Sequence, residues 1–339
     1  MPAMACFDSA KILVTGADGF IGSHLTERLA RAGAAVTALS LYNSFDGHGW
    51  LDDLPANLSG NLSLVRGDIR DPSFVRNLVS GQDIILHLAA LIAIPHSYVA
   101  ARSYVETNVL GTLNVLEASR ECAPGRVVVT STSEVYGTAQ TIPIAESHPL
   151  HGQSPYSATK IGADMLAEAY ARSFGLPVVI LRPFNTFGPR QSERAVIPTI
   201  IRQALDPTCR MLKLGDTTTL RDFTFVEDTV SAFLAVAAAP SIDYGRPYNA
   251  GTGIAVSVAD VIAMVSDLTE TNKPAEQDCQ RLRPAESEVR ALIADSRRLT
   301  ADTGWHAETS LNKGLAETIA WWRTRFERGK VHQSRTYMT

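Results

Sequence analysis

Lys11-Ile12-Leu13-Val14-Thr15-Gly16-Ala17-Asp18-Gly19-Phe20-Ile21-Gly22 joins a short apolar run to a glycine-rich loop and then to an amphipathic stretch over residues 20–32. The apolar run is typical of a buried strand, and the spacing of the apolar residues after the loop is typical of a helix. Backbone amides in such a strand–loop–helix unit can bind a pyrophosphate. The G-x-x-G-x-x-G spacing lets Gly16 turn tightly, Gly19 approach the phosphates and Gly22 pack against the strand. The stretch therefore predicts a dinucleotide-binding βα unit.

The same alternation of strand and helix continues along the first half of the chain. We expect strands over residues 11–15, 35–39, 62–66, 83–88, 126–130 and 178–182, and helices over residues 20–32, 72–80, 98–122 and 154–174. Repeated βα units form a doubly wound parallel sheet, the Rossmann fold of the α/β class, which binds ligands beyond the carboxyl ends of its strands. After Pro183 the pattern becomes irregular and rich in proline. We therefore expect a Rossmann domain over residues 1–182, with a return segment near 225–250, and a smaller mixed α/β C-terminal substrate lobe over residues 183–339.

Composition and charge exclude several classes of protein. The chain has 339 residues and a formal charge of −4, from 31 Lys and Arg against 35 Asp and Glu. It has neither a basic patch nor an uninterrupted run of about 18 apolar residues, so we expect no nucleic-acid partner and no membrane span. Residues 1–10 lack the pattern of a signal peptide. Wide spacing of Cys6, Cys122, Cys209 and Cys279 predicts reduced thiols, no metal site and a cytoplasmic location.

The adenosine end of the predicted dinucleotide site leaves two questions open. An acidic residue about 20 positions after the glycine loop binds the ribose of NAD, and an Arg there accommodates the phosphate of NADP. This chain has Leu39-Ser40-Leu41-Tyr42 at that place, so NAD and NADP are not distinguished. Asp68, after the third strand, could accept a hydrogen bond from the adenine amine, or it could cap a turn or helix before Pro72.

Two segments carry candidate catalytic groups. Tyr156 and Lys160 are four residues apart, so they project from one face of a helix. A nearby ammonium lowers the pKa of a tyrosine, so Tyr156 could act as a base, although such a pair is also common on solvated helix faces. In Ser131–Gly137, after the fifth strand, Thr132 could bind a substrate hydroxyl. Glu134 could be a second base or a solvated loop carboxylate.

Several motifs carry a resemblance to a known family. The glycine loop, Tyr156/Lys160 and the segments His87-Leu88-Ala89-Ala90, 107–112, 131–137 and Arg182-Pro183-Phe184-Asn185 resemble the extended short-chain dehydrogenase/reductase family of nucleotide-sugar epimerases, dehydratases and decarboxylases. The resemblance continues through Arg221-Asp222-Phe223 and Asp295 to Gly304-Trp305. Within that family, residues 41–45, 91–95, 131–140 and 281–284 look most like the nucleotide-activated N-acetylglucosamine 4,6-dehydratases of legionaminic-acid-type pathways.

The resemblance implies a tightly held NAD and a nucleotide-sugar substrate. Tyr156, with Lys160 and Thr132, would take the proton from O4 while a hydride leaves C4, Glu134 would remove the proton from C5, water would leave from C6, and the hydride would return to C6. By similarity the cofactor would contact Gly16, Asp18, Gly19, Phe20, Ile21, Gly22, Asp68, Ile69, Leu88, Ala89, Ala90, Asn108, Tyr156 and Lys160, and the substrate would contact Asn185, Arg190, Val196, Arg221 and Arg283. Helices 98–122 and 154–174 would form a four-helix homodimer interface.

One departure from the family leaves the reaction open. The well-known deoxysugar 4,6-dehydratases have an Asp-Glu pair after the threonine, whereas this chain has Ser133-Glu134, and serine is a poor proton donor. The Thr-Ser-Glu form also occurs in UDP-glucuronate decarboxylases. The other motifs favour dehydration, with Ser133 relaying a proton through water to O6. Decarboxylation, 4-epimerisation and non-catalytic dinucleotide sensing are the alternatives, and neither UDP nor GDP is preferred.

Overall fold

The computed structural model describes residues 7–331, and a parallel sheet of seven strands forms its centre. The strand order is β11-β6-β5-β4-β1-β2-β3, and every neighbouring pair is parallel. Because the chain leaves β1 in one direction to β2 and β3 and then returns to β4 on the other side, the order reverses between β1 and β4. The strands are β1 Lys11–Thr15, β2 Ala35–Leu41, β3 Leu62–Gly67, β4 Ile84–His87, β5 Arg126–Thr130, β6 Val178–Pro183 and β11 Pro247–Ala250.

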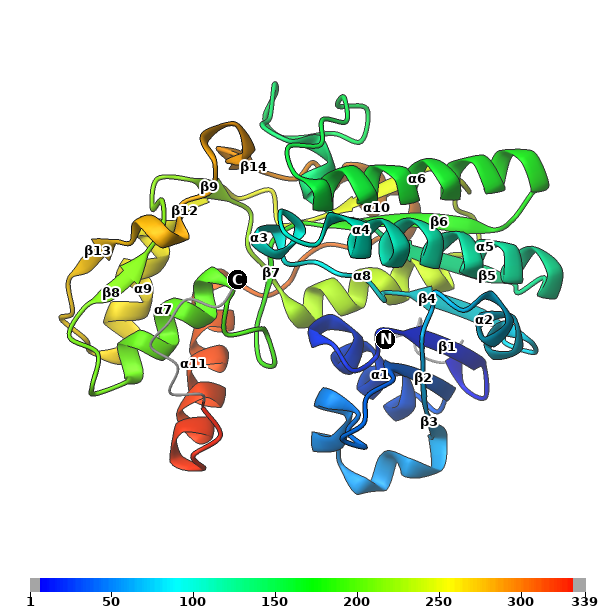
Figure 1. Ribbon diagram of the computed structural model, residues 1–339, viewed down its shortest axis with the longest axis horizontal. Coiled ribbons are helices and arrows are strands. Elements are labelled where there is room, and N and C mark those ends of the chain that lie inside the picture. The colour runs from blue at the N-terminus through cyan, green and yellow to red at the C-terminus, as the bar shows by residue number, and fades with distance from the viewer. Residues whose placement is uncertain (1–6, 332–339) are drawn as a thin grey trace.

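Helices cover both faces of this sheet, and each face has its own buried core. On one face α2 (Pro72–Val79), α5 (Gly111–Cys122) and α6 (Pro155–Phe174) pack on the side chains that alternate strand residues direct toward them. On the other face α1 (Phe20–Arg31) and α8 (Val226–Ala238) do the same, as Figure 1 shows. Full burial of an aliphatic side chain stabilises the fold by roughly 1.5–3 kcal/mol. The α/β doubly wound fold predicted from the sequence is therefore confirmed.

The second half of the chain forms a smaller lobe of helices and short strands beside the sheet (Figure 1). Its core is continuous with the α1 and α8 side of the sheet. Its helices are α7 Val196–Leu205, α9 Val258–Thr269 and α11 Leu311–Glu327, whereas α10 Arg297–Thr303 packs on β11 and α8 of the sheet. The strands are β7 Thr186–Phe187, β8 Leu212–Leu214, β9 Leu220–Arg221, β10 Thr224–Phe225, β12 Val256–Ser257, β13 Ala275–Gln277 and β14 Ala291–Leu292, paired as β10-β7, β12-β9-β14 and β13-β8.

One expected helix differs in detail. The short helix α3 (Ile94–Ser97) precedes the stretch over residues 98–122, which is not one continuous α-helix: it contains α4 (Ala101–Tyr104), a π-helical turn at Val105–Leu110 and then α5. Such wide turns are rare and often lie at functional sites. None of the helices within residues 7–331 is long and apolar enough to cross a membrane. Cys6 lies outside the described residues.

Candidate active site

The glycine loop between β1 and α1 offers backbone amides to a ligand. α1 begins after Gly19 without a side-chain cap, and Phe20 and Ile21 are its first residues. The first amides of a helix have no partner within it, so an uncapped helix start can bind an anion. A Cβ atom at Gly22 would overlap the carbonyl oxygen of Gly16 and lie 2.9 Å from Cα of Ala17, so the close approach of helix and loop requires glycine. The loop therefore suits the pyrophosphate of a dinucleotide.

The loop meets the end of β4 where the strand order reverses. The amides of Leu88 and Ala89 both donate to Oγ1 of Thr15 at 3.1 Å, and this hydroxyl shares a 2.8 Å hydrogen bond with Nδ1 of His87. Because the Thr15 hydroxyl accepts from both amides, it is the donor in its hydrogen bond with Nδ1 of His87. The Nε2 atom of His87 lies 3.1 Å from Oγ1 of Thr112. Burial, followed by the charge of Lys160, lowers the pKa of His87 to about 3. His87 is thus a neutral, buried residue that links β4 to Thr15 and Thr112.

Two predicted cofactor residues make strong contacts within the protein. The Asp68 carboxylate accepts from Nε of Arg70 at 2.9 Å and from Nη2 at 2.5 Å, and the hydrogen bonds of Arg70 lower the pKa of Asp68. Asp68 also accepts from the Arg70 amide, which supports the turn-cap interpretation, whereas Asp71 caps α2. The Asn108 amide group bonds both backbone groups of Leu91 and the Thr159 hydroxyl, so its side chain fixes the loop after β4. Ile69 packs against Gly111, and Ala90 is half-buried.

The predicted catalytic residues meet at the start of α6. Ser154 and Ser157 form a capping box with Pro155 at the first turn, which fixes where the helix begins and directs Tyr156 inward. Tyr156 is buried and its hydroxyl is hydrogen-bonded to Thr132, which follows β5. One turn along the helix, Nζ of Lys160 donates to the carbonyl oxygen of Thr130 at 2.6 Å. The structure thus brings Thr132, Tyr156 and Lys160 together at the carboxyl end of β5.

The expected lowering of the Tyr156 pKa is wrong for the protein without ligands. Burial raises the pKa of Tyr156 above its usual value, the Thr132 hydrogen bond lowers it, and the charges of Glu134 and Asp164 raise it. Burial also lowers the pKa of Lys160 to about 8, while Asp164 raises it. Helix spacing predicted the pairing of Tyr156 and Lys160, but it carries no information on how completely both groups are shielded from water.

A buried hydrogen-bond network adjoins this pair, and Oδ1 of Asp164 is its one carboxylate oxygen without a partner among the described residues. Oδ2 of Asp164 accepts from Ser131 at 2.8 Å and from Nε and Nη2 of Arg182 at 3.0 and 2.8 Å. Arg182 also donates to the Tyr136 hydroxyl at 2.8 Å, and Tyr136 donates to Oδ1 of Asn249 at 2.7 Å. We call Ser131, Tyr136, Asp164, Arg182 and Asn249 the lower network. It ties α6 to the ends of β5, β6 and β11 and so positions the catalytic residues.

A looser cluster of charges lies on the substrate side. Nη1 of Arg283 is 3.8 Å from Oε1 of Glu134 and 3.9 Å from Oε1 of Glu288, and Nη2 of Arg221 is 3.3 Å from Glu288. We call Glu134, Arg221, Arg283 and Glu288 the upper cluster. Burial lowers the pKa of Arg221, and the charge of Arg283 lowers it further. The charges of Glu134 and Glu288 raise the pKa of Arg221 but do not offset the burial. Arg283 Nη1 has no hydrogen bond within residues 7–331.

Of the other predicted substrate residues, two lie beside the end of β6. Oδ1 of Asn185 is buried without a partner among the residues that the structure describes. Val196 is half-buried at the first position of α7. Buried oxygens normally accept a hydrogen bond, so Asn185 is a good candidate to accept one from a ligand.

Arg190 lies elsewhere, which does not support its predicted role as a substrate ligand. Its Nη2 donates to Oε2 of Glu27 on α1 at 2.6 Å, and its backbone has a positive φ of 67°. It contributes to a small cavity of about 200 Å³ with Trp50 and Arg325. Nearby, His24 forms hydrogen bonds with the Glu227 carboxylate and the carbonyl of Pro189.

Sequence reasoning missed three residues that shape the site. Asp164 lies four residues after Lys160 on the same helix face, a spacing that could have revealed it. Tyr104 packs edge-to-face on Tyr156 with ring centres 6.3 Å apart, and His96 lies against Tyr104 rather than in an open loop. Glu288 carried no signal, because its contact with Arg221 joins residues far apart in the sequence.

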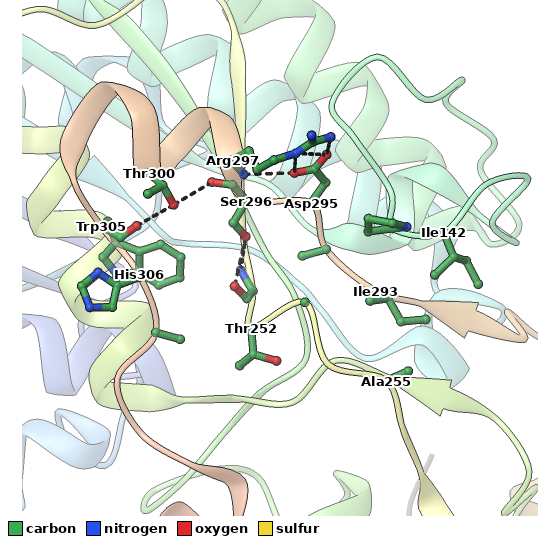
Figure 2. A pocket seen from close by; sticks show the side chains of 15 residues that line it. Ile142, Thr252, Ala255, Ile293, Asp295, Ser296, Arg297, Thr300, Trp305 and His306 are labelled. Carbon is green, nitrogen blue, oxygen red and sulfur yellow. Dashed lines mark hydrogen bonds and ion pairs between the residues drawn. The ribbon is translucent and has the colours of Figure 1, made fainter.

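One cavity lies apart from this site. It has a volume of about 490 Å³ and is lined by the ends of β11 and the segment before and after α10, including Thr252, Ser296 and Trp305. Figure 2 shows that its polar side chains bond one another: Arg297 pairs with Asp295, and Thr300 donates to the carbonyl of Trp305. None of the predicted site residues lines it.

Known proteins are similar to this chain over nearly its whole length. A family profile described as GDP-mannose 4,6 dehydratase matches residues 13–318. The dTDP-glucose 4,6-dehydratase of an Actinoplanes species is 33% identical over 319 residues, which cover 92% of this chain and 98% of that protein. The UDP-N-acetyl-alpha-D-glucosaminuronate decarboxylase of Bacillus cytotoxicus is 33% identical over 324 residues, which cover 92% and 98%. Nucleotide-sugar 4-epimerases also match.

Solved structures agree with the sequence relatives. The crystal structure of dTDP-glucose 4,6-dehydratase from Streptomyces venezuelae, with NAD and TYD bound, has a TM-score of 0.83 and 31% identity, and the match covers 93% of this chain and 98% of that one. Similar structures of dehydratases therefore hold NAD.

Proposed function

The chain belongs to the GDP-mannose 4,6-dehydratase family, short-chain dehydrogenase/reductase-type enzymes that include nucleotide-sugar dehydratases, epimerases and decarboxylases, and we propose that it is a nucleotide-sugar 4,6-dehydratase. The observation that carries the proposal is the meeting of Thr132, Tyr156 and Lys160 at the end of β5, with Glu134 one short turn away. A dinucleotide sensor would need the glycine loop but none of these four side chains.

Each of these side chains has a defined task in the proposed reaction. Tyr156 must lose its proton before it can take the proton of O4. The Thr132 hydroxyl lowers the pKa of Tyr156, and we assign further stabilisation of its phenolate to the Lys160 ammonium one turn along the helix. The chemistry that bound NAD supplies is acceptance of a hydride from C4 and its return to C6. A ketone at C4 acidifies the proton on C5, which Glu134 removes as water leaves from C6 and returns to C5 when the hydride adds to C6.

The proposed assignment of parts follows the fold. We assign NAD binding to residues 1–182 with the return segment 225–250, and binding of the nucleotide sugar to residues 183–339 through Asn185, Arg221 and Arg283. We place the protein in the cytoplasm. A guanidinium suits a diphosphate because it can donate two parallel hydrogen bonds. We propose UDP- or GDP-N-acetylglucosamine as the substrate, converted to its 4-keto-6-deoxy product in a legionaminic-acid-type pathway.

The same proposal includes a homodimer. Val105 and Leu110 on the π-helical turn and Met165 and Phe174 on α6 are large apolar side chains, each more than 40% exposed. Because α5 and α6 lie side by side on one face of the sheet, a second copy could cover these residues by forming a four-helix interface.

Decarboxylation is the second candidate, and Ser133 is the observation that favours it. Ser133 stands where the well-known dehydratases have an acid, and it is buried beside Glu134. Loss of carbon dioxide from a 4-keto acid needs no acid for a leaving hydroxyl. Dehydration instead needs a proton at O6, which we assign to water relayed by Ser133. Unchanged turnover in a Ser133→Ala variant would rule out the relay.

Mass spectrometry of the products distinguishes these reactions. We would incubate the protein with NAD and UDP-N-acetylglucosamine, GDP-N-acetylglucosamine, UDP-glucose or UDP-glucuronate, with a Tyr156→Phe variant as the matched control. We expect loss of one water from a hexosamine nucleotide. Loss of carbon dioxide from UDP-glucuronate would establish the decarboxylase, a new isomer of equal mass would establish an epimerase, and no product from any substrate would overturn the proposed activity.

A further inference from the structure

The end of β2 lacks the carboxylate that usually faces the adenosine ribose. In dinucleotide folds that acid follows the second strand and binds the 2′-hydroxyl. Here Ser40 is buried with its hydroxyl 3.0 Å from Nδ1 of His48, and Leu41 ends the strand. The ribose position therefore needs an acceptor from another part of the chain.

Asp18 of the glycine loop lies at this position. The preceding residue, Ala17, donates its amide to the carbonyl of Leu39 at 3.0 Å, which joins the loop to the end of β2. The backbone amide of Leu41 is a hydrogen-bond donor to the Asp18 carboxylate. Burial raises the pKa of Asp18, while this amide, its own amide and the charge of His48 lower it. The carboxylate is thus partly buried, faces the strand end and keeps further acceptor positions.

The segment after β2 fixes Asp18 in place. The Trp50 amide donates to the carbonyl oxygen of Asp18 at 3.2 Å. A Cβ atom at Gly49, where φ is +58°, would lie 2.9 Å from that oxygen and 3.1 Å from Cβ of Asp18. Glycine therefore allows the segment to pack directly on Asp18. A side chain held on both sides is preorganised for a ligand rather than free to turn away.

The arginine beside the end of β2 is already paired with a carboxylate. Arg66 on β3 is opposite Ser40 in the parallel register, where an arginine could accept a 2′-phosphate. Its Nη1 pairs with the carboxylate of Asp46 instead. A 2′-phosphate at this place would therefore meet the carboxylate of Asp18 and a guanidinium that has a competing partner.

We propose that Asp18 determines cofactor specificity: its carboxylate accepts the ribose hydroxyls of NAD in place of the missing strand-end acid, and it repels the 2′-phosphate of NADP. The inference rests on the proposed function only in requiring a dinucleotide site. It can therefore be tested by binding in the absence of any sugar substrate, so failure of the dehydratase assignment would not affect the result.

The test is equilibrium binding of NAD and NADP to the full chain, freed of bound nucleotide and followed by titration calorimetry. We expect the wild-type protein to bind NAD more tightly. Asp18→Asn replaces a charged hydrogen-bond acceptor by a neutral one, so it should weaken NAD binding about 10-fold or more. NADP binding should stay equal or improve, because the repulsion is removed, and the preference for NAD should fall at least 10-fold.

A matched variant separates specificity from damage to the loop. Asp68→Asn removes a carboxylate after β3, near the predicted adenine position that both cofactors share, so it should leave the ratio of the two dissociation constants unchanged. If Asp18→Asn does not fold, Asp18→Ala must shift the ratio in the same direction. Equal weakening of NAD and NADP binding in the Asp18 variants would mean that Asp18 only shapes the loop. Whether both affinities fall equally or neither changes, an unchanged ratio of the two dissociation constants would overturn the proposal.

Discussion

The lower network and the upper cluster both hold charges of both signs near Tyr156, but they differ in how short the contacts between those charges are. In the lower network the hydrogen bonds from Ser131 and Arg182 to Asp164 measure 2.8–3.0 Å, and both members of the ion pair are at most 3% exposed. In the upper cluster the ion pairs measure 3.3–3.9 Å, and Arg283 is 26% exposed.

The difference indicates separate roles. A buried ion pair is stable only when short hydrogen bonds satisfy both partners, which then hold their neighbours in one geometry. Long contacts between partly exposed charges bind each other weakly and can exchange partners. We therefore interpret the lower network as a support for the catalytic residues and the upper cluster as a receptor for an anion.

The largest expected effect is on turnover, from a substitution of Tyr156. The charges of Glu134 in the upper cluster and Asp164 in the lower network both raise the pKa of this residue. Tyr156→Phe removes the proposed acid–base group and should reduce turnover by about 10²- to 10⁴-fold. The matched control is Tyr170→Phe, the same change on the outer part of α6, where the hydroxyl contacts Glu117. The control should keep its turnover. Steady-state kinetics on both variants check this, and near-normal turnover in Tyr156→Phe would refute the assigned chemistry.

The next effect concerns stability and compares two ion pairs on one helix. Asp164→Asn leaves the Arg182 charge buried without its partner, so it should lower the free energy of unfolding by about 3–5 kcal/mol. Glu168→Gln breaks the exposed pair with Arg172 one turn later and should cost about 0–1 kcal/mol. Urea unfolding of both variants gives the comparison. Equal costs would contradict the supporting role of the lower network.

The burial of His87 makes the free energy of unfolding depend on pH. Its pKa is about 3 in the folded protein and about 6.5 when unfolded, so the unfolded state binds more protons between these values. This contribution to stability is complete above pH 6.5 and is lost as the pH falls toward 3. At pH 4.5 the loss should reach about 2–3 kcal/mol.

Urea unfolding at pH 7.5 and pH 4.5 measures this effect. His87→Gln should lose less stability between the two pH values than the wild type, whereas the exposed His306→Gln should behave like the wild type. If His87→Gln keeps the full pH dependence, the acid sensitivity arises from other groups.

The same contrast explains what could be predicted from the sequence. Local spacing predicted the glycine loop, the repeated βα units and the pairing of Tyr156 with Lys160. Each of these features depends on residues within a few positions of one another. The ion pairs of Arg190 with Glu27 and of Glu288 with Arg221 were not predicted, because in each pair the two residues are distant in the chain. The raised pKa of Tyr156 was missed because burial is a property of the assembled fold.

The smallest expected effects test the upper cluster, and they have opposite signs. Arg283→Met removes a cation for the substrate diphosphate, so KM for the nucleotide sugar should rise about 10-fold with little change in unfolding free energy. Glu288 competes with the substrate for Arg221 and Arg283, so Glu288→Gln should lower KM a few-fold. Kinetics on both variants decide between two arrangements. A rise of KM in Glu288→Gln as well would make Glu288 a ligand of the sugar or ribose hydroxyls, and the upper cluster would then be a bonded site like the lower network rather than an open receptor.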